Sequence, residues 1–409
     1  NFVGGTMFIA RQPIFNRTLD VYGYELLFRA DHGSKAFDGT SDMLATATII
    51  SGLFESGIEA FVEDKRAFVN FNAHFLYSDF TELIDPSHLI VEVLETVKVD
   101  QQLIERIEWL KSKGYKIALD DFVESFQKYP LVPLADIIKF DIMATPLEAI
   151  GKEVKQALAH GKIILAEKIE TEAEFQVAKD MGFHLFQGYF FRKPNIIGKS
   201  GDKTTTKTQY LRLLTELKKV EPSYQVLAEI VEKDIRLAYR LMKVISTRAG
   251  DDLIYSIKRA LTYMGLKELE RWVSIMMLRD LNEHKPQELM RLALVRTKFS
   301  ELIAKHGNLS KIKHEASMMG LFSTIDAMLD QSMTEALEGI SLPKSVSDAL
   351  LLNQGALEPI FTVIQDYEKG DWNSTKVLAE QLGIAVEELS ENYRTALGWA
   401  RETIMLMYD

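Results

Sequence analysis

The feature that most constrains this chain is the alternation of short apolar segments with amphipathic helical patterns between residues 7 and 200. Eight short segments have the composition of strands: 7–15, 22–30, 66–72, 88–95, 116–122, 136–142, 162–169 and 184–191. Between them, the amphipathic runs at 41–54, 100–114 and 171–182 predict helices, and the last two end in glycine, a common helix stop. Strands that alternate with helices predict an α/β fold with a mainly parallel sheet, which eight strands can close into a TIM-like barrel.

The character of the sequence changes after a polar segment. Residues 199–209, KSGDKTTTKTQ, contain almost nothing to bury and are interpreted as a linker. From residue 210 to 409, apolar residues recur at helical spacing without a clear strand pattern, which predicts a second, all-α domain. The first domain then spans 7–198. Residues 1–6 lack the basic-then-apolar pattern of a signal peptide and are interpreted as a remnant before a native start at Met7.

Composition narrows the function classes. The formal net charge of -11 argues against general affinity for nucleic acid or for anionic membranes, so we expect neither partner. The chain has no cysteine, which excludes disulfides and thiolate metal sites and predicts a cytoplasmic protein. No apolar run approaches the roughly 20 residues that a membrane-spanning helix needs.

Polar side chains recur toward the C-terminal ends of the predicted strands. They are Glu25, Asn70, Glu92, Glu95, Asp120, Asp121, Lys139, Glu167, Glu170 and Gln187. Any one of them could be a solvated rim residue or a helix cap, but their repetition argues otherwise, because these ends converge on the face of a barrel where active sites form. Converging carboxylates repel one another unless a cation is present, and carboxylate and amide oxygens suit hard ions such as Mg²⁺ or Mn²⁺. Two such ions could clamp a phosphodiester and activate a water, which Lys139 could orient.

Eight sequence motifs of this half occur in the order and at roughly the spacing of one known family. They are RQPIF, YELLFR, FVNFNA, IVEVLET, ALDDF, IIKFDI, LAEKIET and FQGYFFRKP. Residues 7 to about 194 therefore resemble the EAL family of cyclic di-GMP phosphodiesterases, whose fold resembles a TIM barrel and whose site holds two divalent ions. The resemblance implies an enzyme that opens cyclic di-GMP to linear pGpG.

The resemblance also implies a role for each matching residue. The implied metal ligands are Glu25, Asn70, Glu92 and Asp120 at one ion, with Asp121 and Glu167 toward the second. The implied catalytic residues are Glu25, Lys139, which acts on the nucleophilic water, Glu167 and Gln187. The implied nucleotide contacts are Gln12, Arg29 at a phosphate, and Pro194. The implied supporting carboxylates are Glu95 and Glu170.

The chain departs from the family pattern at three places. Leu26 replaces the alanine of the EAL triplet, Val123 stands where the family has glycine after the paired aspartates, and Lys168 stands where it has glycine in AEKIET. Changes beside metal ligands can alter metal affinity or rate by large factors. Two functions therefore stay open: an active phosphodiesterase, or a catalytically degenerate receptor or scaffold.

Residues 210–409 resemble the HDOD domain, mainly in the segments 213–246 and 254–275. That domain is related to the metal-dependent HD phosphohydrolases but lacks their chemistry, and no His-Asp dipeptide occurs in this chain. The resemblance implies recognition of a protein partner or regulation of the first domain. It also leads us to expect a homodimer.

Overall fold

The computed structural model describes residues 6–31, 57–78, 81–82, 84–123, 126–193, 204–249, 256–282, 285–340 and 342–408. The chain divides into two compact units. The first, called here the barrel unit, comprises Asn1–Lys193, His306–Asn308 and Thr362–Gly398. The second, called here the helical unit, comprises Pro194–Lys305, Leu309–Phe361 and Trp399–Asp409.

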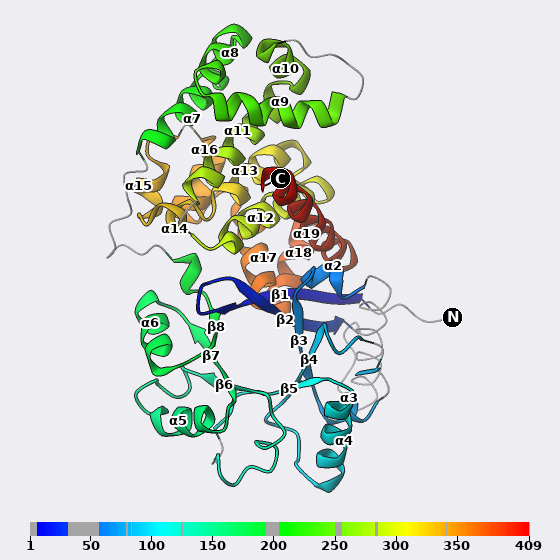
Figure 1. Cartoon of the computed structure of the whole chain (residues 1–409). Helices are drawn as coiled ribbons and strands as arrows, with labels where there is room; N and C mark the ends of the chain where they lie inside the picture. Colours follow the sequence, from blue (N-terminus) through cyan, green and yellow to red (C-terminus); the bar gives the residue numbers. More distant parts are fainter. Residues whose placement is uncertain are drawn as a thin grey trace. The chain divides into compact units, whose positions relative to one another are not determined.

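All eight predicted strands are present and close into a barrel in sequence order (Figure 1). They are β1 Thr6–Asn16, β2 Val21–Asp31, β3 Arg66–Phe71, β4 Leu89–Val93, β5 Lys116–Leu119, β6 Ile137–Asp141, β7 Ile163–Ile169 and β8 Leu185–Gly188. Strand β1 is antiparallel to β2 and to β8, and the other neighbours are parallel. The predicted TIM-like fold is therefore confirmed, and a mainly parallel barrel gathers the ends of its strands on one face.

The barrel is filled by apolar side chains from most of its strands. The central cluster contains Ile14, Phe68, Ile90, Ala118, Ile137, Leu165 and Leu185. The helices of this part are α2 Glu59–Val62, α3 Ala73–Tyr77, α4 Gln101–Ser112, α5 Gly151–Ala159 and α6 Glu172–Met181, with the short η2 Phe190–Arg192. The helices predicted at 100–114 and 171–182 are thus confirmed, whereas the one predicted at 41–54 lies outside the described residues.

The rest of the described chain is helical, as predicted. Its elements are α7 Thr204–Leu217, α8 Tyr224–Glu232, α9 Ile235–Ala249, α10 Ile257–Met264, α11 Leu266–Leu281, α12 Gln287–His306, η3 Ser310–Ile312, α13 Lys313–Phe322, α14 Ile325–Leu329, α15 Met333–Leu337, α16 Lys344–Ser347, η4 Asp348–Leu352, α17 Glu358–Lys369, α18 Trp372–Leu382 and α19 Val386–Tyr408. Helix α7 begins inside the segment 199–209 that the sequence marked as linker, because helical hydrogen bonding extends upstream of the first apolar residue, Tyr210. Within the described ranges, no helix combines the length and the apolar character that crossing a membrane requires.

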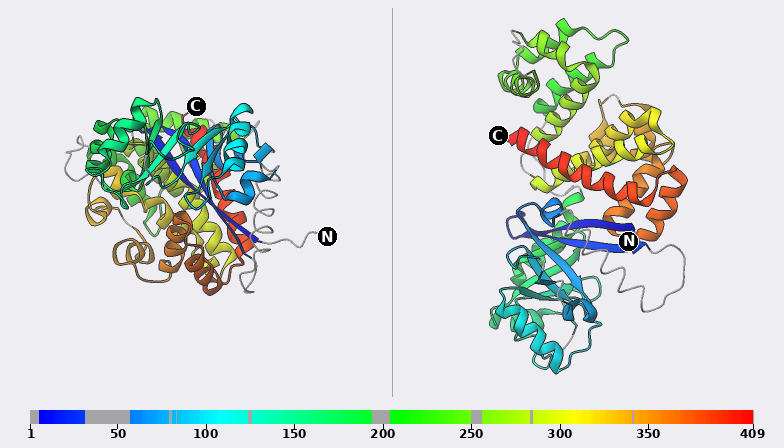
Figure 2. Two further views of the ribbon diagram at one scale, coloured as in Figure 1. Left: turned by 90° about the horizontal axis from the view of Figure 1, so that it is seen from below. Right: turned by 90° about the vertical axis from the view of Figure 1, so that its right-hand side faces the viewer.

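The segment Thr362–Gly398 belongs to the barrel unit, although the sequence analysis placed all of 210–409 in the second domain. The Tyr367 hydroxyl donates a hydrogen bond of 3.0 Å to the carbonyl oxygen of Ile9 on β1. The Trp372 ring stacks on Phe8 of the same strand, with centroids 5.1 Å apart, and Figure 2 shows the orange helices next to β1. Helical periodicity predicts these helices but cannot tell which apolar surface they cover, because that depends on contacts across more than 350 residues of sequence.

Replacing Trp372 tests whether this segment stabilises the barrel unit. We expect Trp372→Ala to lower the free energy of unfolding by about 3–5 kcal/mol, because it empties a buried aromatic site against Phe8 and Tyr367. Val377→Ala, on the same helix but 55% exposed, is the control and should change stability by no more than about 0.5 kcal/mol. Urea unfolding of the full chain measures both variants. Equal midpoints for the two would show that Trp372 packing does not support the fold.

Candidate active site

The side chain of Lys139 lies at the centre of the polar cluster that the sequence predicted at the strand ends. It is on β6 and is completely buried. Its Nζ lies 2.7 Å from Oε1 of Glu92, 2.7 Å from Oδ1 of Asp120 and 2.9 Å from Oε1 of Glu167. A fourth carboxylate, Glu25, is 3.8 Å away. Side chains from four strands and the residue after β5 thus meet around one ammonium group.

Glu25 is held in place by two amides. It lies on β2 and is 7% exposed, and Nδ2 of Asn70 on β3 donates to its Oε1 at 3.0 Å. Nε2 of Gln187 on β8 donates to its Oε2 at 2.6 Å. The register places Asn70 opposite Glu92 on the next strand and Gln12 of β1 opposite Glu25. The barrel's pairing therefore fixes the positions of these residues before any ligand binds.

A second acidic group adjoins the first. Glu95, Asp120 and Asp121 each offer a carboxylate oxygen, and these oxygens lie within 4.8 Å of one another. Asp121 has a positive φ of 40°, which is uncommon for a residue other than glycine. Burial, together with the charge of Asp120, raises the pKa of Asp121. The carboxylates of these three residues are close enough together to hold one cation, beside the Lys139 cluster.

The electrostatics of the cluster follow from one cation facing several acids. Burial raises the pKa of Glu92 well above its ordinary value and that of Glu167 to about 8, in both cases against the opposing effect of Lys139. Burial alone would lower the pKa of Lys139, but the surrounding carboxylates raise it well above its ordinary value. Lys139 is therefore protonated, and the carboxylates that it cannot neutralise must keep protons or bind another cation.

The donor set fits divalent metal ions. Every candidate ligand is a carboxylate or amide oxygen, as hard cations prefer. Two of these oxygens, Oδ1 of Asn70 and Oε1 of Gln187, are buried without a hydrogen-bond partner in the described structure. Buried acceptors are rarely left unpaired, so the site has coordination capacity that the protein itself does not use.

A cavity of about 430 Å³ opens above the cluster. Its lining includes Glu25, Asp120, Asp121, Glu167, Gln187, Gln12 and Glu170, all predicted from the sequence. The lining also includes side chains that the sequence did not predict as ligand contacts: Leu27, Met143, Tyr189 and Lys369. Lys369 is at the C-terminal end of α17, within the barrel unit, more than 170 residues beyond β8 in the sequence. Its distance along the chain is why motif spacing could not connect it with this site.

Lys369 is held at the cavity by its neighbours on α17. Nε2 of Gln12 donates to the carbonyl oxygen of Glu368 at 3.2 Å, and the Glu368 carboxylate pairs with Arg192 at 2.8 Å. The side chain of Glu368 is 4% exposed, so the ion pair with Arg192 is largely screened from water. The anchored backbone of Glu368 brings the exposed Lys369 to the edge of an acidic cavity.

Two of the predicted nucleotide contacts, Pro194 and the side chain of Arg29, lie outside the described residues. Glu170, predicted as a supporting carboxylate, is at the cavity rim and pairs with Lys193 at 2.9 Å. Glu95, the other supporting carboxylate, is exposed and joins Asp120 and Asp121 as described above.

The positions that depart from the family pattern are accommodated in the structure. Val123 is 73% exposed and is not among the residues with positive φ, so its backbone does not require glycine. Lys168 does have a positive φ of 59°, and its ammonium pairs with Asp141. Gly188 remains glycine where it is needed, because a Cβ there would lie 2.0 Å from the carbonyl oxygen of Ile169.

Comparison with known proteins agrees with this architecture. The EAL domain family matches residues 2–194, and the HDOD domain family matches residues 204–342. The chain belongs to the family of proteins that join an EAL domain to an HDOD domain.

Two relatives extend over almost the whole chain. The Uncharacterized protein YuxH of Bacillus subtilis is 33% identical over 406 residues, which cover 96% of this chain and 98% of that protein. The Cyclic di-GMP phosphodiesterase CdgJ of Vibrio cholerae is 33% identical over 403 residues, which cover 97% of this chain and 93% of that protein. Among solved structures, the Bacillus subtilis YkuI protein, with an EAL domain and in complex with c-di-GMP and calcium, is 22% identical. The match covers 65% of this chain and 74% of that chain, with a TM-score of 0.40.

The charge balance of the cluster gives a prediction for the protein stripped of metal. We expect Lys139→Met to reduce the free energy of unfolding by about 3–5 kcal/mol, because it leaves buried carboxylates without their cation. The control is Lys168→Met, whose 54% exposed side chain forms one ion pair at the rim and should contribute at most about 1 kcal/mol. Urea unfolding in the presence of a chelator compares the two. If both losses are equally small, Lys139 is not the electrostatic centre of the cluster.

Proposed function

We propose that this chain is a cyclic di-GMP phosphodiesterase that hydrolyses the cyclic dinucleotide to linear pGpG. The observation that carries the proposal is the cluster of Glu25, Glu92, Asp120 and Glu167 around Lys139, below a cavity that can admit a ligand. The proposal is supported by the 33% identity to a relative named a cyclic di-GMP phosphodiesterase, which extends over nearly the whole of both chains. The unpartnered oxygens of Asn70 and Gln187 support metal-assisted chemistry.

The reaction breaks one phosphodiester bond of the ring. Oxygen of a water molecule bonds to phosphorus, the bond from phosphorus to the 3′ oxygen breaks, and that oxygen leaves with a proton as a hydroxyl group. Bound divalent ions, for which we propose Mg²⁺ or Mn²⁺, would supply an acidified water and positive charge at the phosphate. Glu25, Asn70, Glu92 and Asp120 would hold one ion, and Asp121 and Glu167 the other.

Lys139 would act on the nucleophilic water. Its Nζ lies within 2.9 Å of carboxylate oxygens of Glu92, Asp120 and Glu167, which are among the proposed metal ligands, so its amino group would lie beside the water held there and could orient it. Gln187 would position the groups bound beside Glu25, since its amide already reaches that carboxylate and its oxygen is unpartnered. Gln12, beside Gln187 in the same hydrogen-bonded network, would contact the nucleotide.

The proposal includes the setting of the reaction. We place it in the cytoplasm, on the absence of cysteine in the chain. We also propose that the helical unit contacts a protein partner or regulates the barrel, and that the chain forms a homodimer. These three proposals rest on composition and on family resemblance.

Nucleotide turnover tests the main proposal. Purified full-length protein incubated with cyclic di-GMP and Mg²⁺ or Mn²⁺ should release linear pGpG, detected by chromatography. Glu25→Ala should reduce the rate by at least about a hundredfold, because it removes a buried carboxylate that two amides hold at the proposed metal site. The control Glu105→Ala alters an exposed residue of α4 and should retain full activity.

Three other results are informative. If no product forms but equilibrium dialysis shows that the protein retains cyclic di-GMP, the protein is a receptor and not a phosphodiesterase. Absence of both would leave a scaffold built on the barrel. Equal loss of activity in Glu25→Ala and Glu105→Ala would place the activity away from this cavity.

A second prediction concerns the residue that the helical segment brings to the cavity. We expect Lys369→Ala to raise KM for cyclic di-GMP about five- to tenfold with little change in kcat, because its ammonium would contact a substrate phosphate rather than the reacting water. Lys369→Arg should retain most of the affinity. Lys344→Ala, at a lysine whose side chain is 88% exposed and outside the cavity, is the matched control. A kcat effect without a KM effect would contradict this role.

A further inference from the structure

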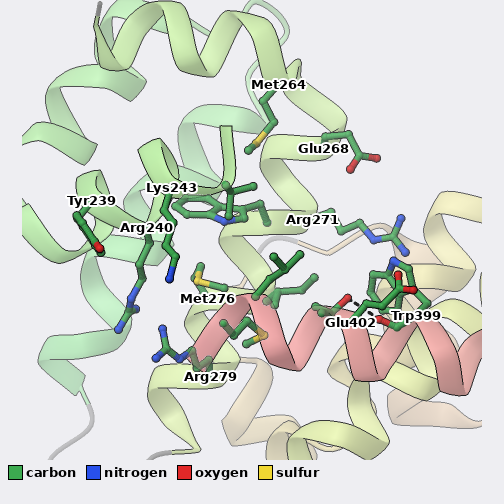
Figure 3. A pocket seen from close by; sticks show the side chains of 16 residues that line it. Tyr239, Arg240, Lys243, Met264, Glu268, Arg271, Met276, Arg279, Trp399 and Glu402 are labelled. Carbon is green, nitrogen blue, oxygen red and sulfur yellow. Dashed lines mark hydrogen bonds between the residues drawn. The ribbon is translucent and has the colours of Figure 1, made fainter. Parts of the chain in front are cut away.

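The helical unit contains a second cavity, independent of the barrel (Figure 3). Its volume is about 470 Å³, within the range of roughly 300–1,000 Å³ that is usual for small-molecule sites. Its walls come from α9, α10 and α11 and from the last turns of α19. Residues separated by more than 160 positions in the sequence thus enclose one space, which neither the sequence motifs nor the proposed reaction uses.

One part of the wall is apolar. Met264 on α10, Trp272, Ile275 and Met276 on α11, and Met407 on α19 line the cavity, and each is at most 9% exposed. Methionine and tryptophan make an adaptable, polarizable surface that suits a flat or flexible apolar body. The indole Nε1 of Trp272 is a buried donor without a hydrogen-bond partner in the described residues.

Another part of the wall is cationic. Arg240 and Lys243 on α9 and Arg279 on α11 lie at the same end of the cavity in Figure 3. The two helices are joined there by Arg240, whose Nη1 lies 2.9 and 3.1 Å from the two carboxylate oxygens of Asp280. That pair fixes the orientation of the Arg240 guanidinium. The lining carboxylates, Glu268 and Glu402, are toward the other end in the same view.

The separation of charge within the cavity argues against an ordinary packing gap. Empty gaps in protein interiors are lined by apolar atoms, whereas this one combines buried apolar side chains with a group of cations at one end. At the other end the guanidinium of Arg271 lies 4.7 Å over the Trp399 ring and pairs with Glu301 at 3.0 Å, and the lining carboxylates of Glu268 and Glu402 at that end would repel an anion. The cationic end around Arg240 is therefore the part that matches an anionic ligand group.

We propose that this cavity binds a small amphipathic anion: an aromatic or aliphatic body against Trp272 and Met276, with one phosphate, sulfonate or carboxylate group at Arg240, Lys243 and Arg279. The proposal does not depend on the phosphodiesterase activity. It gives the helical unit a ligand site of its own.

A pair of fluorescent probes tests the proposal on the full chain. The probe 8-anilinonaphthalene-1-sulfonate has an aromatic body and one anionic group, and N-phenyl-1-naphthylamine has the same aromatic body without the charge. We expect the sulfonate to saturate one site per chain and to quench tryptophan emission. The titration is run with a chelator present, which keeps the carboxylates of the barrel cavity unfavourable for an anion.

Variants that replace a cationic side chain by a neutral polar one identify the cationic end. Lys243→Gln and Arg279→Gln should each weaken sulfonate binding about three- to tenfold and leave the neutral probe unchanged. The control Lys258→Gln replaces an exposed lysine of α10 that does not line the cavity and should change neither titration. Circular dichroism and thermal unfolding check that each variant is folded.

Three outcomes would overturn the proposal. The first is that the sulfonate shows no saturable binding. The second is that Lys243→Gln and Arg279→Gln weaken the binding of both probes equally. The third is that Lys258→Gln weakens sulfonate binding as much as the cavity variants do. Ile275→Trp, which fills the apolar part, should abolish binding of both probes, and if it fails to fold the two charge variants still decide the matter.

Discussion

The interaction on which the barrel's polar face depends is the contact of one buried ammonium with several carboxylates. Lys139 is fully buried, and three carboxylate oxygens lie within 2.9 Å of its Nζ. Removing such charges from water is costly for each of them, and the mutual attraction offsets that cost only when the geometry is close and the remaining lone pairs are satisfied. The amides of Asn70 and Gln187 meet this need at Glu25. The cluster is consequently both a structural element of the barrel and a site that still favours additional positive charge.

The helices after residue 357 complete the barrel unit, because they cover part of β1 and add a residue to its cavity. Tyr367 and Trp372 cover Phe8 and Ile9 on β1, and the C-terminal end of α17, between these two residues, carries Lys369 to the cavity. A barrel cut at the predicted domain boundary near 198 would expose this part of β1 and would lack one cation of its cavity. The chain's two functional regions are thus interleaved in sequence, because the barrel unit resumes at Thr362 after most of the helical unit.

Much of the barrel could be read from the sequence, because each element carries its own local signal. Apolar runs marked the eight strands, and polar residues at their ends marked Glu25, Asp120 and Lys139. The end of the linker was misplaced, since a helix can begin in polar residues before its apolar face starts at Tyr210. Lys369 and the cavity at Trp272 were not foreseen. Periodicity identifies a buried helix face but not the distant segment that packs against it, nor the space that the packing leaves.

The substitutions at Val123 and Lys168 leave the catalytic activity open on sequence alone. The two positions differ in backbone conformation, because only Lys168 has a positive φ. Val123 is exposed and has no positive φ, so its backbone does not need the conformational freedom of glycine. Lys168 adopts a left-handed conformation that suits glycine better, at a strain of about 1–3 kcal/mol. Its ammonium group pairs with the carboxylate of Asp141, which lies opposite Glu167 in the strand register. Glu167 pairs instead with Lys139. Lys168 therefore changes the rim of the cavity, whereas Val123 does not line it, and the carboxylates of Glu92, Asp120 and Glu167 remain in contact with Lys139 beneath it. This arrangement supports the proposed enzyme over a degenerate scaffold.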